Sequence, residues 1–300
     1  MTNQAVRMRA NLMLLTTALI WGVAFVAQSV GMDYIGAFTF NCVRSLIGGA
    51  VLLPCIWVLD RLDGRGKPGP GEKKKWPVIG GVCCGLILGV ASSFQQFGIV
   101  YTTVGKAGFI TALYIVIVPL LGMLLGRRVG GRIWLAVGLA VGGMYLLCIT
   151  ESFSIGFGDL LVLISALCFS VHILVIDHFS PGADGVRMSC IQFFTAGALC
   201  AVPMLLFETP SLAAILAAWQ PVLYAGVMSC GVAYTLQVVA QKHTDPTVAS
   251  LLLSLESVIA VLAGWILLGQ TLSARELAGC VLSFCAIILA QLPERRLRPQ

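Results

Sequence analysis

Charged side chains are scarce in this sequence, and histidine is nearly absent. Only 11% of the 300 residues are charged, and three are histidines. The mean hydropathy of +0.95 is higher than a soluble domain of this length would sustain. The shortage of charge therefore excludes a soluble globular protein and predicts a polytopic membrane protein. We expect a lipid bilayer around it and no nucleic-acid partner.

Patterns that would indicate a metal, a disulfide or a bound nucleotide are also missing. The eleven cysteines contain no CxxC pair and have no histidine at ligand spacing, so we interpret them as small apolar packing residues. Gly64, Gly66 and Gly69 form a GxGxxG pattern, but prolines interrupt it and no strand precedes it. We expect no cofactor and no metal.

Long apolar runs separated by short polar breaks are what the sequence does contain. These runs have the length that a helix needs to cross the hydrocarbon of a bilayer, and the fifth, sixth and tenth lie at the short end of that range. The ten predicted spans are residues 11–30, 37–58, 77–101, 107–125, 133–149, 158–176, 188–207, 221–240, 247–268 and 275–291.

Lysine and arginine fall almost entirely on one side of these spans. Sixteen of the 19 basic residues lie in the segments that share a side with the N-terminus, including the basic linker 60–76. The opposite side holds only Lys106 and Arg275, and Arg44 lies within a span. This positive-inside bias predicts an even number of spans, with both termini in the cytoplasm.

Glu256 lies near the middle of the ninth span and is its one ionisable residue. A charged side chain at that depth costs about 2.5–3.5 kcal/mol, so it is expected to face protein or water rather than lipid. Arg44 lies about seven residues into the second span and needs a partner of its own. The two side chains either form a structural ion pair or line a cavity, where Arg44 would bind the carboxylate of a zwitterion and Glu256 its ammonium group.

Other polar and aromatic residues within the spans are candidates for the same cavity. His172 is either a hydrogen-bonded structural residue or part of a proton relay, and Glu256 is the stronger candidate for proton coupling. Trp21, Tyr101, Gln96 and Tyr234 are predicted to contact substrate. Further possible lining residues are Gln28, Ser92, Ser93, Gln95, Tyr114, Gln192 and Gln237.

Glycines spaced by four residues indicate close helix packing. Gly81, Gly85 and Gly89 form a stripe on the third span, and Gly138 and Gly142 form one on the fifth.

A short sequence motif occurs twice in the chain and suggests two repeats. Leu124-Leu125-Gly126 recurs as Leu267-Leu268-Gly269, each before a glycine-containing span. With five spans in each half, an odd number, the two copies would lie in opposite orientations. Chance resemblance between apolar helices is the alternative.

Several motifs, taken together and in order along nearly the whole chain, resemble the EamA family of the drug/metabolite transporter superfamily. They are Leu19-Ile20-Trp21-Gly22, residues 101–111 leading to Val118-Pro119, Gly158-Asp159-Leu160, and Ser254-Leu255-Glu256 followed by Leu267-Leu268-Gly269.

This resemblance implies an all-α integral membrane protein, with about ten transmembrane helices in two inverted five-helix EamA repeats around a central cavity. The repeats would be residues 1–149 and 150–292, with a cytoplasmic tail at 293–300. Family members typically export small metabolites across a bacterial inner membrane. Two departures stand out. Ser257 replaces a common proline, which predicts a straighter ninth helix near Glu256, and Arg127 and Gln270 replace a glutamate that often follows Leu-Leu-Gly.

The sequence therefore predicts a secondary transporter in a cell inner membrane, and not an enzyme. We expect alternating-access export of a small polar or zwitterionic, amino-acid-like metabolite, with proton coupling through Glu256 as a hypothesis. The alternatives are a carrier of sugars, nucleotide sugars or drugs, a polytopic membrane enzyme, and a channel. A monomer and a homodimer are both compatible with the sequence.

Overall fold

The computed structural model describes residues 3–62, 73–102, 104–148, 156–268 and 273–291, and these residues form no strand. Residues 63–72 of the linker, Thr103, Gln270 and the predicted tail 293–300 lie outside the described residues. The helices are α1 (Asn3–Gly31), α2 (Ala37–Leu62), α3 (Trp76–Val100), α4 (Val104–Thr111), α5 (Tyr114–Leu124), α6 (Gly131–Cys148), α7 (Phe157–Phe179), the 3₁₀ turn η1 (Ser180–Gly182), α8 (Gly185–Phe207), α9 (Leu212–Ala217), α10 (Trp219–Leu223), the π-helix η2 (Tyr224–Tyr234), α11 (Thr235–Gln241), α12 (Pro246–Leu253), α13 (Leu255–Leu268) and α14 (Ala274–Gln291).

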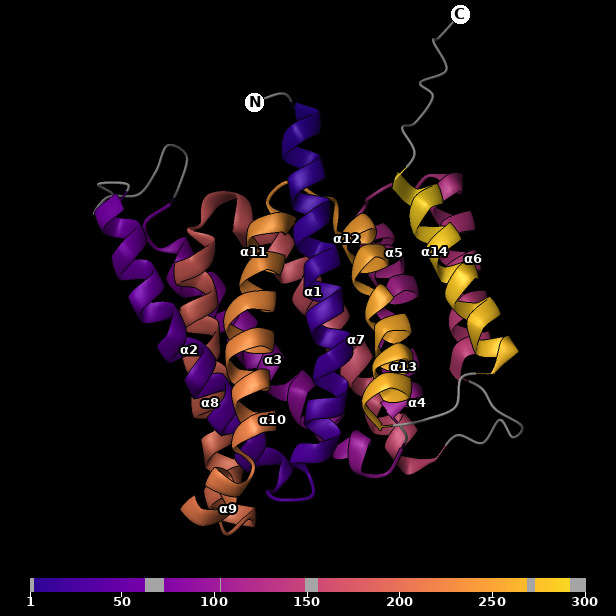
Figure 1. Ribbon diagram of the computed structural model, residues 1–300. Helices are drawn as coiled ribbons and strands as arrows, with labels where there is room; N and C mark the ends of the chain where they lie inside the picture. Colours follow the sequence, from indigo (N-terminus) through magenta and orange to yellow (C-terminus); the bar gives the residue numbers. More distant parts are fainter. Residues whose placement is uncertain (1–2, 63–72, 103, 149–155, 269–272, 292–300) are drawn as a thin grey trace, which may run out of the picture.

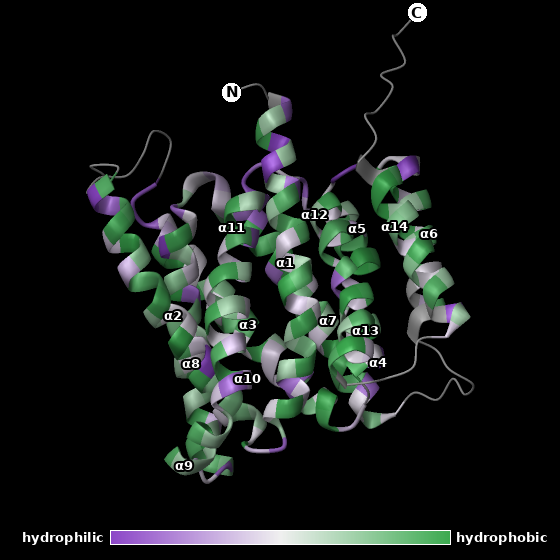
Figure 2. Ribbon diagram, viewed as in Figure 1, coloured by the Kyte–Doolittle hydropathy of each residue, from purple (hydrophilic) through white to green (hydrophobic). Residues whose placement is uncertain are grey.

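The helices form a bundle of membrane-spanning length (Figure 1). Within the described residues, eight spans are long and apolar enough to cross a bilayer. The helices α6 and α14, 18 residues each, supply the fifth and tenth spans with shorter apolar stretches. Apolar residues cover the length of the bundle, and hydrophilic residues gather mainly toward the helix ends (Figure 2). The predicted all-α membrane architecture is confirmed.

The two halves of the chain pack in corresponding ways. Helix α1 packs on α12 and α13, as α7 packs on α4 and α5. Helix α3 packs on α7 and α8, as the eighth span (α10, η2, α11) packs on α1 and α2. The pairs α2 with α8 and α6 with α14 complete the pattern. Exchanging the halves therefore reproduces the same contacts, and five spans per half place the copies in opposite orientations.

Spans four and nine are each broken at the same relative position. The fourth span changes from α4 to α5 at residues 112–113, and the ninth changes from α12 to α13 at Ser254. The ninth span is therefore interrupted two residues before Glu256, although Ser257 is not a proline. Ser254 and Ser257 each donate a side-chain hydroxyl to a carbonyl three residues earlier, at 2.8 Å. Such back-bonding competes with the regular helical hydrogen bonds and bends a helix without proline.

The motif Leu124-Leu125-Gly126 ends the fourth span. Gly126 has a φ of +80°, the one positive φ among the described residues. Its N–H donates to the Met123 carbonyl, and the Arg127 N–H donates to the Gly122 carbonyl at 3.0 Å. These are the two bonds of a Schellman cap, which favours glycine in the left-handed conformation. The first copy of the repeated Leu-Leu-Gly motif therefore has a structural role as a helix C-cap.

Glycine contacts confirm one predicted stripe and correct the other. A Cβ on Gly81, Gly85 or Gly89 would lie within 2.8 Å of α8 atoms, so α3 and α8 approach closely there. On the fifth span Gly138 has nothing within 4 Å, and the tight contact is made by Gly143 against Gly279 of α14. The fifth span does pack closely through a glycine, as predicted. Which glycine faces the partner helix depends on the rotation of the span, and the sequence alone does not give that rotation.

Candidate functional site

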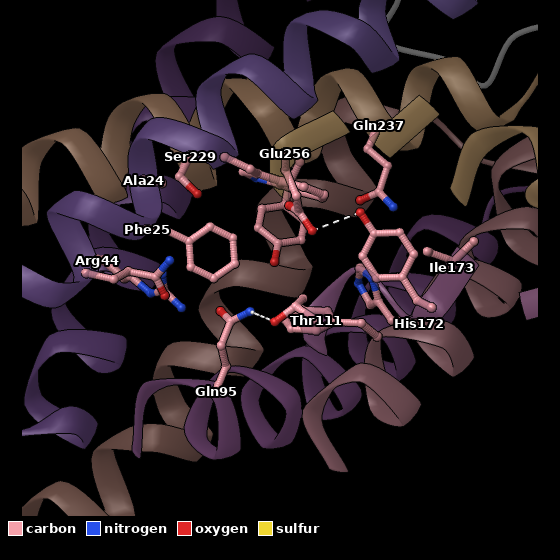
Figure 3. Close-up of a pocket in the computed structure, with 15 residues that line it drawn as sticks. Ala24, Phe25, Arg44, Gln95, Thr111, His172, Ile173, Ser229, Gln237 and Glu256 are labelled. Atoms are coloured by element: carbon pink, nitrogen blue, oxygen red, sulfur yellow. Dashed lines mark hydrogen bonds between the residues drawn. The ribbon is translucent and has the colours of Figure 1, made fainter. Parts of the chain in front are cut away.

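A buried cavity lies at the centre of the bundle, and both halves contribute to it. Its charged and polar lining comes from α1, α2, α3, α4, α5, α7, η2, α11 and α13 (Figure 3). The lining residues are Trp21, Ala24, Phe25, Gln28, Arg44, Gln95, Thr111, Tyr114, Phe169, His172, Ile173, Ser229, Tyr234, Gln237 and Glu256.

Arg44 and Glu256 both line this cavity but do not pair with each other. Arg44 is 5% exposed and Glu256 is 3% exposed. Figure 3 shows Arg44 on one side of the cavity and Glu256 across it. No salt bridge within 4.0 Å joins them in the part of the chain that the structure describes. A structural ion pair between these two residues is therefore not present in this conformation.

Arg44 is held mainly by an aromatic ring from its own helix. Its guanidinium carbon lies 5.5 Å from the centroid of the Phe40 ring, within cation–π range. Its Nε is buried and has no hydrogen-bond partner among the described residues. A guanidinium carries five donors in a fixed fork that matches a carboxylate, so this cation remains available to an anionic group in the cavity.

Two hydrogen bonds between helices cross the lining of the cavity. The Tyr114 hydroxyl donates to Glu256 Oε1 at 2.8 Å, linking α5 to α13. The Gln95 Nε2 donates to Thr111 Oγ1 at 3.1 Å, linking α3 to α4 (Figure 3). Both bonds involve a residue beside the break in the fourth span.

Aromatic side chains form one wall of the cavity. The rings of Trp21 and Tyr234 lie 4.5 Å apart, and His172 packs edge-on against Tyr234 at 6.0 Å. His172 Nε2 also lies 3.0 Å from Gln192 Oε1, within hydrogen-bonding distance. Tyr234 ends the π-helix η2, and Ser229 in the same element also faces the cavity. A π-helix is rare and often occurs at functional sites.

Two residues predicted to contact substrate lie elsewhere. Tyr101 is 63% exposed just after α3, where its ring packs on Phe157 at 5.8 Å. Gln96 is fully buried, but it donates to the Gln28 carbonyl at 3.0 Å and does not line the cavity. Its neighbour Gln95 does. Adjacent residues on a helix point in directions that differ by about 100°. In a span that is apolar on all sides, hydropathy alone does not show which of the two residues faces the cavity.

Several lining residues were missed by sequence reasoning. Thr111, Ser229, Phe25 and Phe169 line the cavity but were not among the candidates. Small hydroxyl residues and phenylalanine occur throughout membrane spans, so their identity carries little signal. The break after Thr111 and the π-helix around Ser229 turn them inward, and neither feature is evident from hydropathy.

Four lining residues have a buried polar atom that lacks a hydrogen-bond partner among the described residues. They are Trp21 Nε1, Gln28 Oε1, Arg44 Nε and Gln237 Oε1. Leaving such a group unpaired costs about 1–3 kcal/mol. A set of donors and acceptors around one cavity is therefore suited to a polar solute or to water.

The cavity is contracted in this conformation. Its volume is about 30 Å³, which is room for water rather than for a metabolite. A solute of even ten heavy atoms would require the lining helices to move apart.

A membrane-spanning bundle of two oppositely oriented repeats around a buried polar cavity is the architecture of secondary transporters. The chain belongs to the EamA-like transporter family, whose model matches residues 8–149 and 156–292. The two matches cover the two halves that pack in corresponding ways. The chain is therefore a multi-pass membrane transporter of the EamA type.

Curated relatives and a solved structure agree with this assignment. An uncharacterized transporter of Archaeoglobus fulgidus is 31% identical over 287 residues, covering 95% of this chain and 87% of the relative. The uncharacterized transporter YoaV of Bacillus subtilis is 23% identical and covers 92% of this chain and 94% of its own. A crystal structure aligns with a TM-score of 0.77 at 22% identity, over 97% of this chain and 99% of that one, and supports the fold alone.

Proposed function

We propose that this transporter exports a small zwitterionic metabolite of the amino-acid type, with the solute's carboxylate on Arg44 and its ammonium group at Glu256. The observation that supports this is the arrangement of the two charges. They line one buried cavity from different halves of the chain and do not neutralise each other. A zwitterion placed between them would pair with both and remove the cost of holding two separated charges away from water.

The neutral groups of the cavity favour a solute with several hydrogen-bonding positions. Trp21 Nε1 is a donor, whereas Gln28 Oε1 and Gln237 Oε1 are acceptors, and all three are unpartnered in this conformation. A purely apolar solute would leave them unpaired and would bind weakly. These groups therefore support a polar cargo.

The mechanism in this proposal is alternating access. The two inverted repeats rock about the central cavity, which opens to one side of the membrane and then to the other. The contracted cavity would be an intermediate between these open states. Solute transport without chemical conversion is part of the proposal, and it sets the protein apart from a membrane enzyme.

Proton coupling is proposed to act through Glu256. Arg44, His172, Tyr114 and Tyr234 are the charged or titratable groups that line the cavity with it. His172 lies within hydrogen-bonding distance of Gln192 on α8, which favours a structural role for the ring. We therefore expect Glu256, rather than His172, to exchange the coupling proton.

The proposed location is a cell inner membrane with both termini in the cytoplasm. Helix α1 begins and α14 ends at the same end of the bundle (Figure 1). Arg7, Arg127, Arg187 and Lys242 lie at helix ends on that side, whereas Lys106 and Arg275 lie at the opposite side. This distribution supports the positive-inside orientation. Export is the direction typical of the family.

A ligand panel with single-charge deletions tests the substrate class. Purified protein would be heated with each common amino acid, with its N-acetyl and methyl-ester derivatives, and with sugars and nucleotide sugars. Saturating ligand at 100 times its dissociation constant stabilises the folded state by about 2.7 kcal/mol. We expect the zwitterion to raise Tm more than either derivative or any sugar does. Glu256→Gln should no longer distinguish the zwitterion from its N-acetyl derivative. Arg44→Gln should no longer distinguish the zwitterion from its methyl ester. Stabilisation by sugars in both variants would contradict the proposal.

Proteoliposomes test the coupling ion. Transport by the wild type is expected to respond to an imposed pH gradient, and the residual counterflow of Glu256→Gln, measured at raised solute concentration, is expected to lose that response. If Glu256→Gln kept its full response to the gradient, this residue would have no part in proton coupling. Saturable counterflow would also distinguish the carrier from a channel.

A further inference from the structure

The two broken spans meet inside the cavity. The fourth span breaks at residues 112–113, directly before Tyr114, and the ninth breaks at Ser254, directly before Leu255 and Glu256. At the first break the Ile115 N–H donates to the Ala112 carbonyl, and at the second the Ser257 N–H donates to the Ser254 carbonyl, both three residues back. The repeats therefore bring equivalent irregular backbone segments to the same place.

One hydrogen bond between side chains joins these segments, and apolar side chains of both spans pack around it. The Tyr114 hydroxyl donates to Glu256 Oε1 at 2.8 Å, and both residues are nearly fully buried, at 2% and 3% exposure. Both line the cavity. A cationic group that approaches the Glu256 carboxylate therefore meets one oxygen, Oε1, that already accepts a hydrogen bond from Tyr114.

We propose that Tyr114 is a positioning residue that holds Glu256 in the contracted cavity and is displaced when the ammonium group of the solute binds. This inference rests on the proposed function. Displacement removes this hydrogen bond between the fourth and ninth spans, so that binding of the solute in the cavity weakens one link between the two repeats. The hydroxyl lowers the affinity for the solute, because its hydrogen bond must be given up, and it stabilises the contracted state when no solute is present.

Labelling without any solute tests the contact itself. Ser229 lines the cavity from η2 and makes no hydrogen bond among the described residues, so Ser229→Cys introduces a reporter thiol. The neutral reagent methyl methanethiosulfonate would be applied to the purified protein, and modification of residue 229 followed by mass spectrometry. Tyr114→Phe keeps the ring and removes the hydroxyl. We expect it to raise the modification rate at least fivefold.

Tyr234→Phe provides the matched control. This variant also removes a tyrosine hydroxyl from the cavity lining, but one that makes no hydrogen bond among the described residues. Its modification rate should equal that of the reporter alone. Equal rates for Tyr114→Phe and Tyr234→Phe would overturn the proposal, and so would a slower rate for Tyr114→Phe.

Protection by propylamine tests the competition for Glu256. This probe carries only the cationic half of a zwitterion, and the readout is its half-protecting concentration against labelling at position 229. Loss of a hydrogen bond to a charged group corresponds to about tenfold in a dissociation constant. We therefore expect Tyr114→Phe to lower the half-protecting concentration about tenfold and Glu256→Gln to abolish protection.

The two variants separate failure of this inference from failure of the proposed function. If Glu256→Gln is protected as well as the wild type, or the wild type is not protected, the ammonium site at Glu256 is wrong. If Glu256→Gln loses protection but Tyr114→Phe changes neither labelling nor the half-protecting concentration, the ammonium site stands and the role of Tyr114 is wrong.

Discussion

Arg44 and Glu256 face one cavity from opposite repeats and form no ion pair with each other among the described residues. Each buried charge is instead held by a neutral aromatic residue. Phe40 lies beneath the guanidinium, and Tyr114 donates to the carboxylate. The cavity is therefore lined by a cationic and an acidic side chain on opposite sides, and in the proposed function these two groups select the solute.

Substitution of Arg44 by lysine should impair transport although the charge is kept. Lysine is a compact point charge and lacks the planar fork that binds a carboxylate through two hydrogen bonds. We expect Arg44→Lys to lower the initial transport rate in proteoliposomes at least tenfold. Arg61→Lys is the control, because Arg61 also contacts an aromatic ring, that of Trp57 at 3.9 Å, but lies at the end of α2 outside the cavity. Equal loss in both variants would show that the effect is not specific to the cavity.

A methyl group at Gly85 should destabilise the fold. A Cβ there would lie 2.5 Å from the Gln192 carbonyl oxygen, which is backbone and has little freedom to move. Overpacking of this kind costs about 1–3 kcal/mol. Gly85→Ala is therefore expected to lower Tm in detergent, whereas Gly138→Ala, with nothing within 4 Å of the added carbon, should leave Tm unchanged or raise it. A lower Tm for Gly138→Ala alone would contradict the observed packing of these helices.

The carboxylate of Asp159 should contribute more to stability than that of Asp60. Asp159 accepts hydrogen bonds from the Gly156 N–H at 2.8 Å and the Thr102 hydroxyl at 2.7 Å, and its side chain is 5% exposed beside Lys106. Asp60 pairs with Arg187, but both side chains are more than a third exposed. We expect Asp159→Asn to cost about 1–3 kcal/mol and Asp60→Asn about 0–1 kcal/mol, measured as Tm shifts. The reverse order would refute this ranking.

Reporter fusions should place both termini in the cytoplasm. Alkaline phosphatase is active only outside the cytoplasm, so a fusion after Gly156, at the start of α7, should be active, whereas fusions after Gly185 and at the C-terminus should be inactive. A fluorescent protein at the C-terminus should fluoresce. An active phosphatase at the C-terminus would reverse the proposed orientation.

The architecture could be predicted because hydropathy and charge act over whole segments. A run of about 20 apolar residues predicts a span, and basic residues predict which loops share a side, whatever the helix rotation. Arg44, Glu256, Trp21, His172 and Tyr234 were placed among the candidates because a polar or amphipathic residue inside such a run is costly or unusual.

The details of the cavity could not be predicted because they depend on rotation and on breaks. Gln95 rather than Gln96 faces the cavity, and the two differ by one position on a helix that is apolar on all sides. The break at Ser254 coincides with serine hydroxyls that donate to carbonyls three residues earlier, and such bonds are not evident from hydropathy. The hydrogen bond between Tyr114 and Glu256 follows from two such breaks meeting, which no local pattern encodes.

The last helix of each repeat has a separate place in the bundle. Helices α6 and α14 pack mainly on each other, beside the rest of the bundle (Figure 1), and supply no residue to the cavity. Yet Ala136 and Val137 of α6 and Ala286 of α14 form one apolar cluster with Ala112, Ile115 and Leu251, which lie next to the two breaks. Sequence changes in this outer pair would thus alter how fast the carrier cycles while leaving its choice of cargo intact.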